Sequence, residues 1–593
     1  MKKIVKLLYL IPILYVMFLS VSCEKQFLEK PTGSDLIVDS IFATERKAMG
    51  AISQAYSQGL AVGFPLYKWI LQVKEEPNDE YGMLHGTVAN ISDETYMNNN
   101  WSYDYHIISG GMTADNGTGA PLTEDAYVWN WTAIRACYLT IENIDKVTDM
   151  SDGEKEQVKA EMKTIIAYRY QEMLKRYGGV PIVEKTFNAA DDMMIPRASI
   201  EEMITFIETL CDEAATILPD SYPPDMVGRV TKGVALSVKA EAHMFAARPL
   251  FNSAEPYLSL GGENNKFICF GNSDASRWEK AIEANLQVID WAANSGHYLI
   301  NTGSPLEDYG VATSEPGNPE IILAYKWDAN DWNTGLYAWF NPHEPEYGRE
   351  IPIGFQMLEQ YYKEDGTDQI WLAKTDTMQF SDYFNKCDEM EPRFKASICK
   401  VAGEALNNPG DLAWSYSTNN GIGAGLGNEG CGSTIKFWAN AGDRKWMEFP
   451  IYRLAENYLN LAEAYNEVGN SGQALNYLNI IRERAGVPDV TETNKEKLRG
   501  IIQREWAVEF FEESHRLYDI KHWKIASEIM GTPRYRFVYS YTAGPAGPND
   551  VAGDFNKYWI SSYVNGFWSP SQYLVPFPVK EINKGYLVQN PGY

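Results

Sequence analysis

The sequence predicts a mostly α-helical protein, an α–α superhelix of tetratricopeptide-like helical pairs with long irregular loops and a few short strands. Helical blocks with apolar residues three or four positions apart recur along the chain, and the clearest of them form hairpins. Long stretches rich in Gly, Asn, Pro and aromatic residues separate them, at 64–130, 295–350 and 405–450. Loops of that length in a compact protein are usually functional or carry small strands.

The first strong helix is expected over Glu154 to Tyr177. From Ile166 to Tyr177 its large apolar residues follow spacings of four, three and four, which place them on one face. Ser151, three residues before Glu154, predicts a capping box, and the pair Gly178-Gly179 predicts the end of the helix.

Later blocks repeat this pattern. An Ala-rich helix is expected over Val230 to Leu250, and Ser276-x-x-Glu279 predicts a second capping box before another helix. The clearest pair is near the C-terminus, where helices marked by Leu454 to Val468 and by Ala474 to Ile481 flank a Gly-rich turn. A single hairpin cannot bury its apolar face alone, so the pairs are expected to stack on one another.

The N-terminus has the pattern of an export signal, residues 1–22. Three lysines precede an apolar stretch of 13 residues, Leu7 to Leu19, which is shorter than the about 20 residues that a membrane-spanning helix needs. Small residues then lead to Cys23, as in a bacterial lipobox, so Cys23 is expected to carry acyl chains that hold the protein on a membrane. The alternative is an ordinary secretory signal with a cysteine near the cleavage site.

Composition and motifs argue against several functions. The net charge of −27 disfavours nucleic acid as a partner. The run 425–430 matches G-x-G-x-x-G but sits in a Gly/Asn-rich stretch, and the segment from Asp331 lacks the Gly and acidic residue of a calcium loop. We therefore predict no catalytic residue, no metal ligand and no cofactor, although a bound calcium ion elsewhere is not excluded by these patterns.

Aromatic residues in the loops suggest a binding surface instead. The chain has 17 Trp and 37 Tyr. A flat indole or phenol beside amide and carboxylate groups suits the apolar face and polar rim of a sugar, and such rings lose little rotamer entropy on binding. Two loop segments and one further tryptophan combine these features, which makes the following residues candidate ligand contacts: Asn98, Asn100, Trp101, Tyr103, Trp327, Trp332, Asn333 and Trp69.

Motifs along the whole mature chain resemble the SusD/RagB family of outer-membrane nutrient-binding lipoproteins. The C-terminal third carries the most specific of them. In order, the matching segments are 24–29 after Cys23, Trp129-Asn130, 168–170, 176–181, 277–281, 391–394, 453–456, 462–464, 482–486, Arg504-Glu505, 516–520 and 589–593. The resemblance implies one domain over 23–593, with an N-terminal part of about 23–300 and a C-terminal part of about 301–593.

The resemblance also implies a function. Members of this family are expected to sit at the cell surface, on the outer membrane, as a lid on a SusC-like TonB-dependent transporter. They capture oligo- or polysaccharide during polysaccharide utilization and nutrient uptake, without being enzymes. Three alternatives remain open for this chain: a lipoprotein that captures peptides, a surface glycoside hydrolase with paired carboxylates, and a scaffold that makes only protein contacts.

Overall fold

The computed structural model describes most of the chain. The described residues are 38–61, 88–95, 107–114, 127–188, 190–328, 353–373, 375–378, 380–399, 433–434, 436, 446–541 and 555–593.

Helices dominate this part of the molecule, and the strands are few and short, as predicted. The helices are α3 (Glu45–Ala61), α5 (Tyr127–Asn143), α6 (Asp152–Tyr177), α7 (Ile200–Ala215), α8 (Lys232–Ala247), α9 (Ser276–Ser295), α10 (Pro305–Ser314), α12 (Phe355–Leu358), α13 (Phe380–Asp388), α14 (Pro392–Ser397), α16 (Leu454–Glu467), α17 (Ser471–Ala485), α18 (Lys495–Glu509), α19 (Arg516–His522), α20 (Ala526–Met530) and α21 (Val579–Ile582). The strands are β1 (Ile321–Asp328), β2 (Ile398–Cys399), β3 (Ser433–Thr434), β4 (Trp446–Arg453), β5 (Arg534–Tyr541) and β6 (Phe555–Val564).

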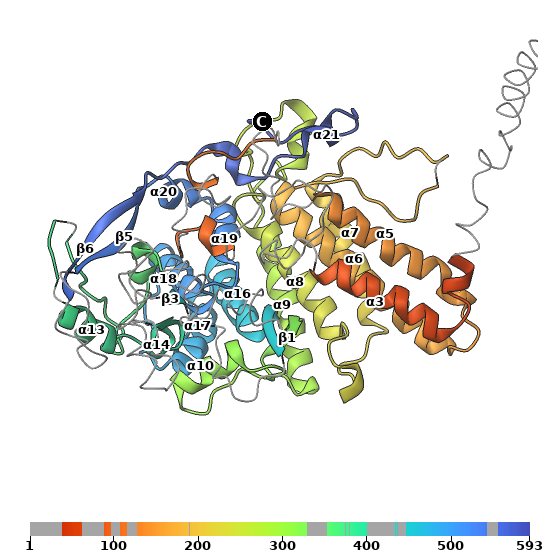
Figure 1. Cartoon of the computed structure of the whole chain (residues 1–593). Helices are drawn as coiled ribbons and strands as arrows, with labels where there is room; N and C mark the ends of the chain where they lie inside the picture. The colour runs from red at the N-terminus through yellow and green to blue at the C-terminus, as the bar shows by residue number, and fades with distance from the viewer. Residues whose placement is uncertain are drawn as a thin grey trace, which may run out of the picture.

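The helices pack in a continuous series. Helices α3, α5, α6, α7, α8 and α9 each contact the next in that order, then α9 contacts α16, and α16 contacts both α17 and α18. Figure 1 shows α3, α5 and α7 at one end, α8 and α9 in the middle, and α16 to α18 toward the other end. The chain between α9 and α16, residues 296–453, is therefore an insertion into the helical stack. It contains the second aromatic segment.

Local signals predicted both ends of α6 but not the start of α9. The Ser151 hydroxyl accepts from the Glu154 amide and the Glu154 carboxylate accepts from the Ser151 amide, which confirms the first capping box. Helix α6 ends at Tyr177, before Gly178. The second predicted capping box is wrong, because α9 begins at Ser276 itself and the Asp274 carboxylate accepts from its amide instead.

Each of the three sheets in the described residues is a single antiparallel strand pair: β1 with β4, β2 with β3, and β5 with β6. Pairing of β1 with β4 joins the two ends of the insertion, since the residue opposite Ile321 is Arg453, the last residue before α16. The hairpin of β5 and β6 projects from the edge of the helical stack (Figure 1).

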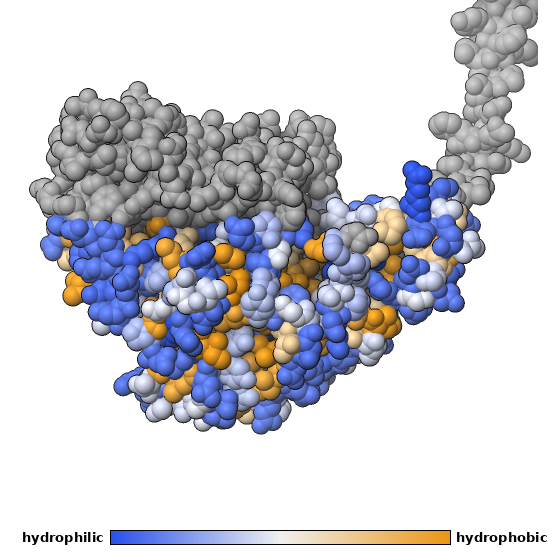
Figure 2. Space-filling model, turned by 90° about the horizontal axis from the view of Figure 1, so that it is seen from below, coloured by the Kyte–Doolittle hydropathy of each residue, from blue (hydrophilic) through white to orange (hydrophobic). Residues whose placement is uncertain are grey.

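One large hydrophobic cluster runs through the helical stack, and a second one covers the residues around α12 to α14 and β6. Four cysteines of the described residues, Cys137, Cys211, Cys269 and Cys387, are buried free thiols. On the face seen in Figure 2, hydrophobic residues lie in separate groups among hydrophilic ones. Among the described helices, none has the length and hydropathy needed to cross a membrane.

Candidate functional site

Most of the predicted ligand residues lie outside the described part of the chain. These are Trp69, Asn98, Asn100, Trp101, Tyr103, Trp332 and Asn333, together with the lipidation candidate Cys23. Trp327 is placed by its backbone in β1, opposite Met447. The described residues therefore locate the ends of the aromatic segments, and the predicted contacts themselves stay predictions.

The ends of these segments meet at one place. Thr95, where the segment 96–106 begins, forms an antiparallel bridge with Ile353, where the segment 329–352 ends. Next to it, the Gly354 amide donates a hydrogen bond of 2.8 Å to the Glu94 carbonyl oxygen. The segment 62–87, with Trp69, ends at Val88. We call residues 88–95 with 353–354 the loop anchor. It joins three segments that are far apart in sequence.

Every residue from Val88 to Thr95 is buried. Asp93 accepts two hydrogen bonds from the Arg516 guanidinium, at 2.9 and 3.0 Å. Arg534 donates to the Ile91 carbonyl oxygen at 3.0 Å. Two arginines from the C-terminal part thus hold this N-terminal segment against α19 and β5, and bidentate guanidinium–carboxylate bonds of this kind are strong and directional.

The two segments of the loop anchor, 88–95 and 353–354, approach each other so closely that no side chain fits at Gly354. A Cβ atom there would lie 2.8 Å from the Asp93 carbonyl oxygen and 3.3 Å from that of Glu94. The backbone of Gly354, with φ −67° and ψ 145°, suits any residue. Close approach of the two backbones, and not a special backbone conformation, is therefore the reason for glycine at this position.

A carboxylate pair lies beneath the loop anchor. The Glu94 carboxylate accepts from the Glu512 amide at 2.9 Å, and both residues are fully buried. Burial, followed by the negative charge of Glu512, raises the pKa of Glu94 to about 8. At Asp93, by contrast, the charges of Arg516 and Arg534 outweigh burial and hold the pKa of the carboxyl below its usual value.

The backbone beneath the loop anchor is strained. Glu512 has φ 64° and Ser514 has φ 69°, in the left-handed region that non-glycine residues rarely adopt. Such residues persist only where the surrounding structure holds them, and they concentrate at functional sites. The loop anchor therefore combines three features. The backbone beneath it is strained, one of its carboxyls has a raised pKa, and three segments that contain aromatic residues have their ends there.

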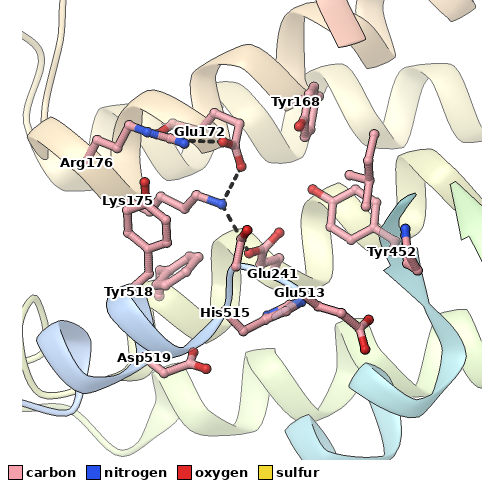
Figure 3. A pocket seen from close by; sticks show the side chains of 14 residues that line it. Tyr168, Glu172, Lys175, Arg176, Glu241, Tyr452, Glu513, His515, Tyr518 and Asp519 are labelled. Atoms are coloured by element: carbon pink, nitrogen blue, oxygen red, sulfur yellow. Dashed lines mark hydrogen bonds and ion pairs between the residues drawn. The ribbon is translucent and has the colours of Figure 1, made fainter. Parts of the chain in front are cut away.

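A second buried polar region lies near the middle of the helical stack. Lys175 points toward Glu172 and Glu241, at 2.5 and 4.0 Å, and Tyr168 and Tyr452 line the same cavity (Figure 3). The cavity has a volume of about 30 Å³, enough for one or two water molecules. Its size suits structural water and not a sugar.

The most charged region of the interior is an arginine–glutamate cluster. It consists of Arg393, Arg453, Arg484, Glu320, Glu391, Glu505, Glu509 and Glu513, all fully buried or nearly so. Arg453 alone contacts Glu320 at 2.9 Å, Glu509 at 2.7 Å and Glu513 at 2.7 Å. The cluster joins α14, β4, α17 and α18, so it fastens the insertion to the helical stack.

Sequence reasoning located the cluster only in part. The spacing of Arg504, Glu505 and Glu509 predicts ion pairs that brace the last helices, and Glu505 and Glu509 do pair with arginines of the cluster. Arg504 instead contacts Asp368 at 2.6 Å. The loop anchor was missed, because Asn90 to Thr95 has neither a motif nor a periodicity that marks it as functional.

In the described residues, no group of three or more His, Cys, Asp or Glu side chains is arranged to hold a metal ion. The carboxylates of the arginine–glutamate cluster are buried and paired with arginines, and the Glu94 carboxyl is buried. The active site of a glycoside hydrolase would need two accessible carboxylates on opposite sides of the glycosidic bond.

Comparison with known proteins identifies relatives along the whole chain. The family model described as "SusD family" matches residues 319–593, and the one described as "Starch-binding associating with outer membrane" matches residues 66–242. A SusD-like protein P2 of Formosa agariphila is 24% identical over 99% of both chains. The starch-binding protein SusD of Bacteroides thetaiotaomicron is 23% identical over 78% of both chains.

Solved structures show the same fold. A SusD-like protein of Bacteroides fragilis has a TM-score of 0.70 at 23% identity and covers 94% of this chain and 98% of its own. The surface glycan-binding protein A of Bacteroides thetaiotaomicron has a TM-score of 0.58 at 19% identity and covers 93% of this chain and 100% of its own. With two family models that match different parts of the chain and relatives aligned along its length, the chain belongs to the SusD family.

Proposed function

We propose that this protein is a lipoprotein of the cell surface that binds an oligo- or polysaccharide and delivers it to a SusC-like TonB-dependent transporter of the outer membrane. Two relatives are named for binding starch or surface glycans, and one family model describes outer-membrane association. Binding suffices for this task, so no residue of the chain is assigned a catalytic role.

The loop anchor is the observation that carries the proposal. Because Thr95 pairs with Ile353, the segment with Trp101 and the segment with Trp332 leave the described protein side by side. Aromatic residues from two segments can then contact one sugar chain. Fixed ends of these segments favour binding, because the entropy lost when long loops become ordered reduces affinity.

Affinity electrophoresis tests this proposal. The full-length protein, purified from membranes in detergent, is run through native gels cast with starch, pullulan, levan, xylan, mannan or agarose, and its retardation is compared with that of Trp101→Ala and Trp332→Ala. We expect at least one polysaccharide to retard the wild type. Each substitution should weaken that binding about tenfold, which corresponds to about 1.4 kcal/mol. Unchanged retardation of both variants would refute the assignment of these tryptophans.

Tyr298→Ala is the matched control. Tyr298 is 59% exposed and lies outside the segments 62–87, 96–106 and 329–352 that meet at the loop anchor, so its removal should leave retardation unchanged. The alternatives give different results in the same assay. Shorter products after incubation would indicate a glycoside hydrolase, displacement by peptides would indicate a peptide-capturing lipoprotein, and absence of any ligand would favour the scaffold.

Anchoring and delivery need a test in cells. Cys23→Ala should abolish lipidation, and protease added to intact cells should then no longer find the protein at the surface. In the wild type, mild detergent extraction should recover the protein together with a TonB-dependent transporter. Equal surface exposure with and without Cys23 would show that a lipid at this cysteine does not place the protein there.

A further inference from the structure

A groove that shares no residue with the loop anchor lies on the C-terminal part of the protein. One wall is the turn between Tyr362 and Asp368, and the other is the loop 486–494 between α17 and α18. The floor is a face of α18. The groove has a volume of about 630 Å³, within the range of about 300–1,000 Å³ that small-molecule sites occupy.

Two arginines hold the walls in place. Arg504 lies over the Tyr362 ring, 3.7 Å from its centroid, and bonds the Gln360 carbonyl oxygen at 2.6 Å and Asp368 at 2.6 Å. Arg482 lies 4.8 Å from the same centroid and donates to the Pro488 carbonyl oxygen at 2.8 Å. The groove is thus formed before any ligand arrives, which lowers the entropy lost on binding.

The floor contains a glycine that the fold itself does not need. Gly500 lies within α18, is exposed, and has no positive φ; a Cβ atom there would meet no other atom within 4 Å. Glycine inside a helix is less favourable than alanine. A ligand that lies directly on the helix backbone would account for glycine at this position, since a side chain would occupy its place.

The lining indicates the class of ligand. Carboxylates Asp365 and Asp489 and the ammonium of Lys497 lie exposed around the groove, while Pro488 and Ile501 provide apolar surface between them. A neutral molecule with many hydroxyl groups can donate to the carboxylates, accept from the lysine and lay an apolar face on the floor. An anion would face several carboxylates, and a purely apolar ligand would leave polar groups without partners.

We propose that this groove is a second carbohydrate-binding site, which takes a short segment of a neutral sugar chain against Gly500. It acts beside the site that the proposed function places at the aromatic segments, and it rests on that function. Two linked sites on one polysaccharide raise the apparent affinity through effective concentration. Long chains should therefore bind more tightly than short ones, even where the repeating unit is the same.

The substitution Gly500→Ala separates loss of binding from loss of folding. Alanine stabilises the helix, so the midpoint of thermal unfolding should rise slightly while binding at the groove falls. A methyl group in a contact of this size changes affinity about tenfold. The matched control is Gly50→Ala in α3, which also adds a methyl group to open space inside a helix and lies at the other end of the molecule (Figure 1). It should stabilise without affecting binding.

Native gels with the same set of polysaccharides test the proposal on full-length protein in detergent. The double variant Trp101→Ala/Trp332→Ala should retain weak retardation by at least one polysaccharide, and adding Gly500→Ala should remove it. Equal retardation of the double variant with and without Gly500→Ala, or no retardation by any of the polysaccharides, would overturn the second site. Displacement by tetralysine but not by oligosaccharides would also overturn it, in favour of a cationic peptide. If the two tryptophan substitutions abolished retardation by themselves, the proposed function would stand and only the second binding site would be refuted.

Discussion

The arginine–glutamate cluster and the loop anchor each contain a completely buried glutamate, Glu509 and Glu94, and the pKa values of these two carboxyls shift in opposite directions. At Glu509, the charges of Arg484, Arg453 and Arg393 outweigh burial and lower the pKa of the carboxyl far below its usual value. At Glu94, burial and the neighbouring Glu512 raise the pKa to about 8. The first carboxylate is therefore charged across the physiological pH range, and the second is protonated over most of it.

This difference follows the tasks of the two regions. The arginine–glutamate cluster joins helices of the stack, and each of its arginines pairs with two or more glutamates. The loop anchor holds the bases of aromatic segments, next to strained backbone at Glu512 and Ser514. A buried charged pair stabilises little by itself but costs much when one partner is removed. The same perturbation should thus have unequal consequences in the two regions.

The largest effect is expected at Arg453. Arg453→Met leaves Glu320, Glu509 and Glu513 without one of their cations in the interior, and breaking a buried pair in this way costs about 3–5 kcal/mol of unfolding free energy. Urea unfolding followed by circular dichroism measures it. As the control, Lys146→Met removes an exposed pair with Asp39, at 2.7 Å, and should cost less than about 1 kcal/mol. Similar losses in both variants would contradict the role given to the arginine–glutamate cluster.

A smaller effect on stability, with a larger one on binding, is expected at Gly354. Gly354→Ala places a methyl group 2.8 Å from the Asp93 carbonyl oxygen, so the two backbones must separate. Overpacking of this kind costs about 1–3 kcal/mol. Because the bases of two aromatic segments separate with them, retardation by the polysaccharide ligand should fall about tenfold or more. Gly310→Ala in α10, where a Cβ atom has open space, should stabilise the helix slightly and leave retardation unchanged. Retained binding in Gly354→Ala would show that the loop anchor does not organise the site.

Local signals explain why much of the helical stack was predictable. The capping box at Ser151 and Glu154 and the hairpin of α16 and α17 depend on residues near one another in sequence. Packing decides other details, such as the burial of Trp523 and the half-burial of Trp129.

The loop anchor depends on contacts that no local pattern reveals. Asp93 and Arg516 are separated by 423 residues, and Glu94 and Glu512 by 418. Single-sequence patterns of charge or hydropathy report neighbours within a few turns of a helix or strand, so they could not pair these residues. The aromatic composition indicated a binding surface, but which of its residues contact a ligand remains a prediction.

The last effect, and the most specific one because it depends on pH, is expected from Glu94→Gln. The pKa of Glu94 is raised in the folded state, so between the unfolded value near 4.5 and about 8 the folded protein binds more protons than the unfolded one. Stability contributed by this residue is therefore present at low pH and decreases as pH rises toward about 8. Glutamine mimics the protonated carboxyl, so the stability of the variant should exceed that of the wild type by an amount that grows from near pH 5 to about pH 8 and then levels off.

Thermal unfolding of both proteins between pH 5 and pH 9 measures this difference. Glu509→Gln gives the opposite sign for comparison, because the charged form of Glu509 is the one that its arginines stabilise, and its loss should be destabilising at neutral pH. If Glu94→Gln instead lowered stability at pH 7, the Glu94 carboxyl would have to be ionised and paired in the folded protein at that pH. The proposed difference between a protonated Glu94 in the loop anchor and a charged Glu509 in the arginine–glutamate cluster would then be refuted.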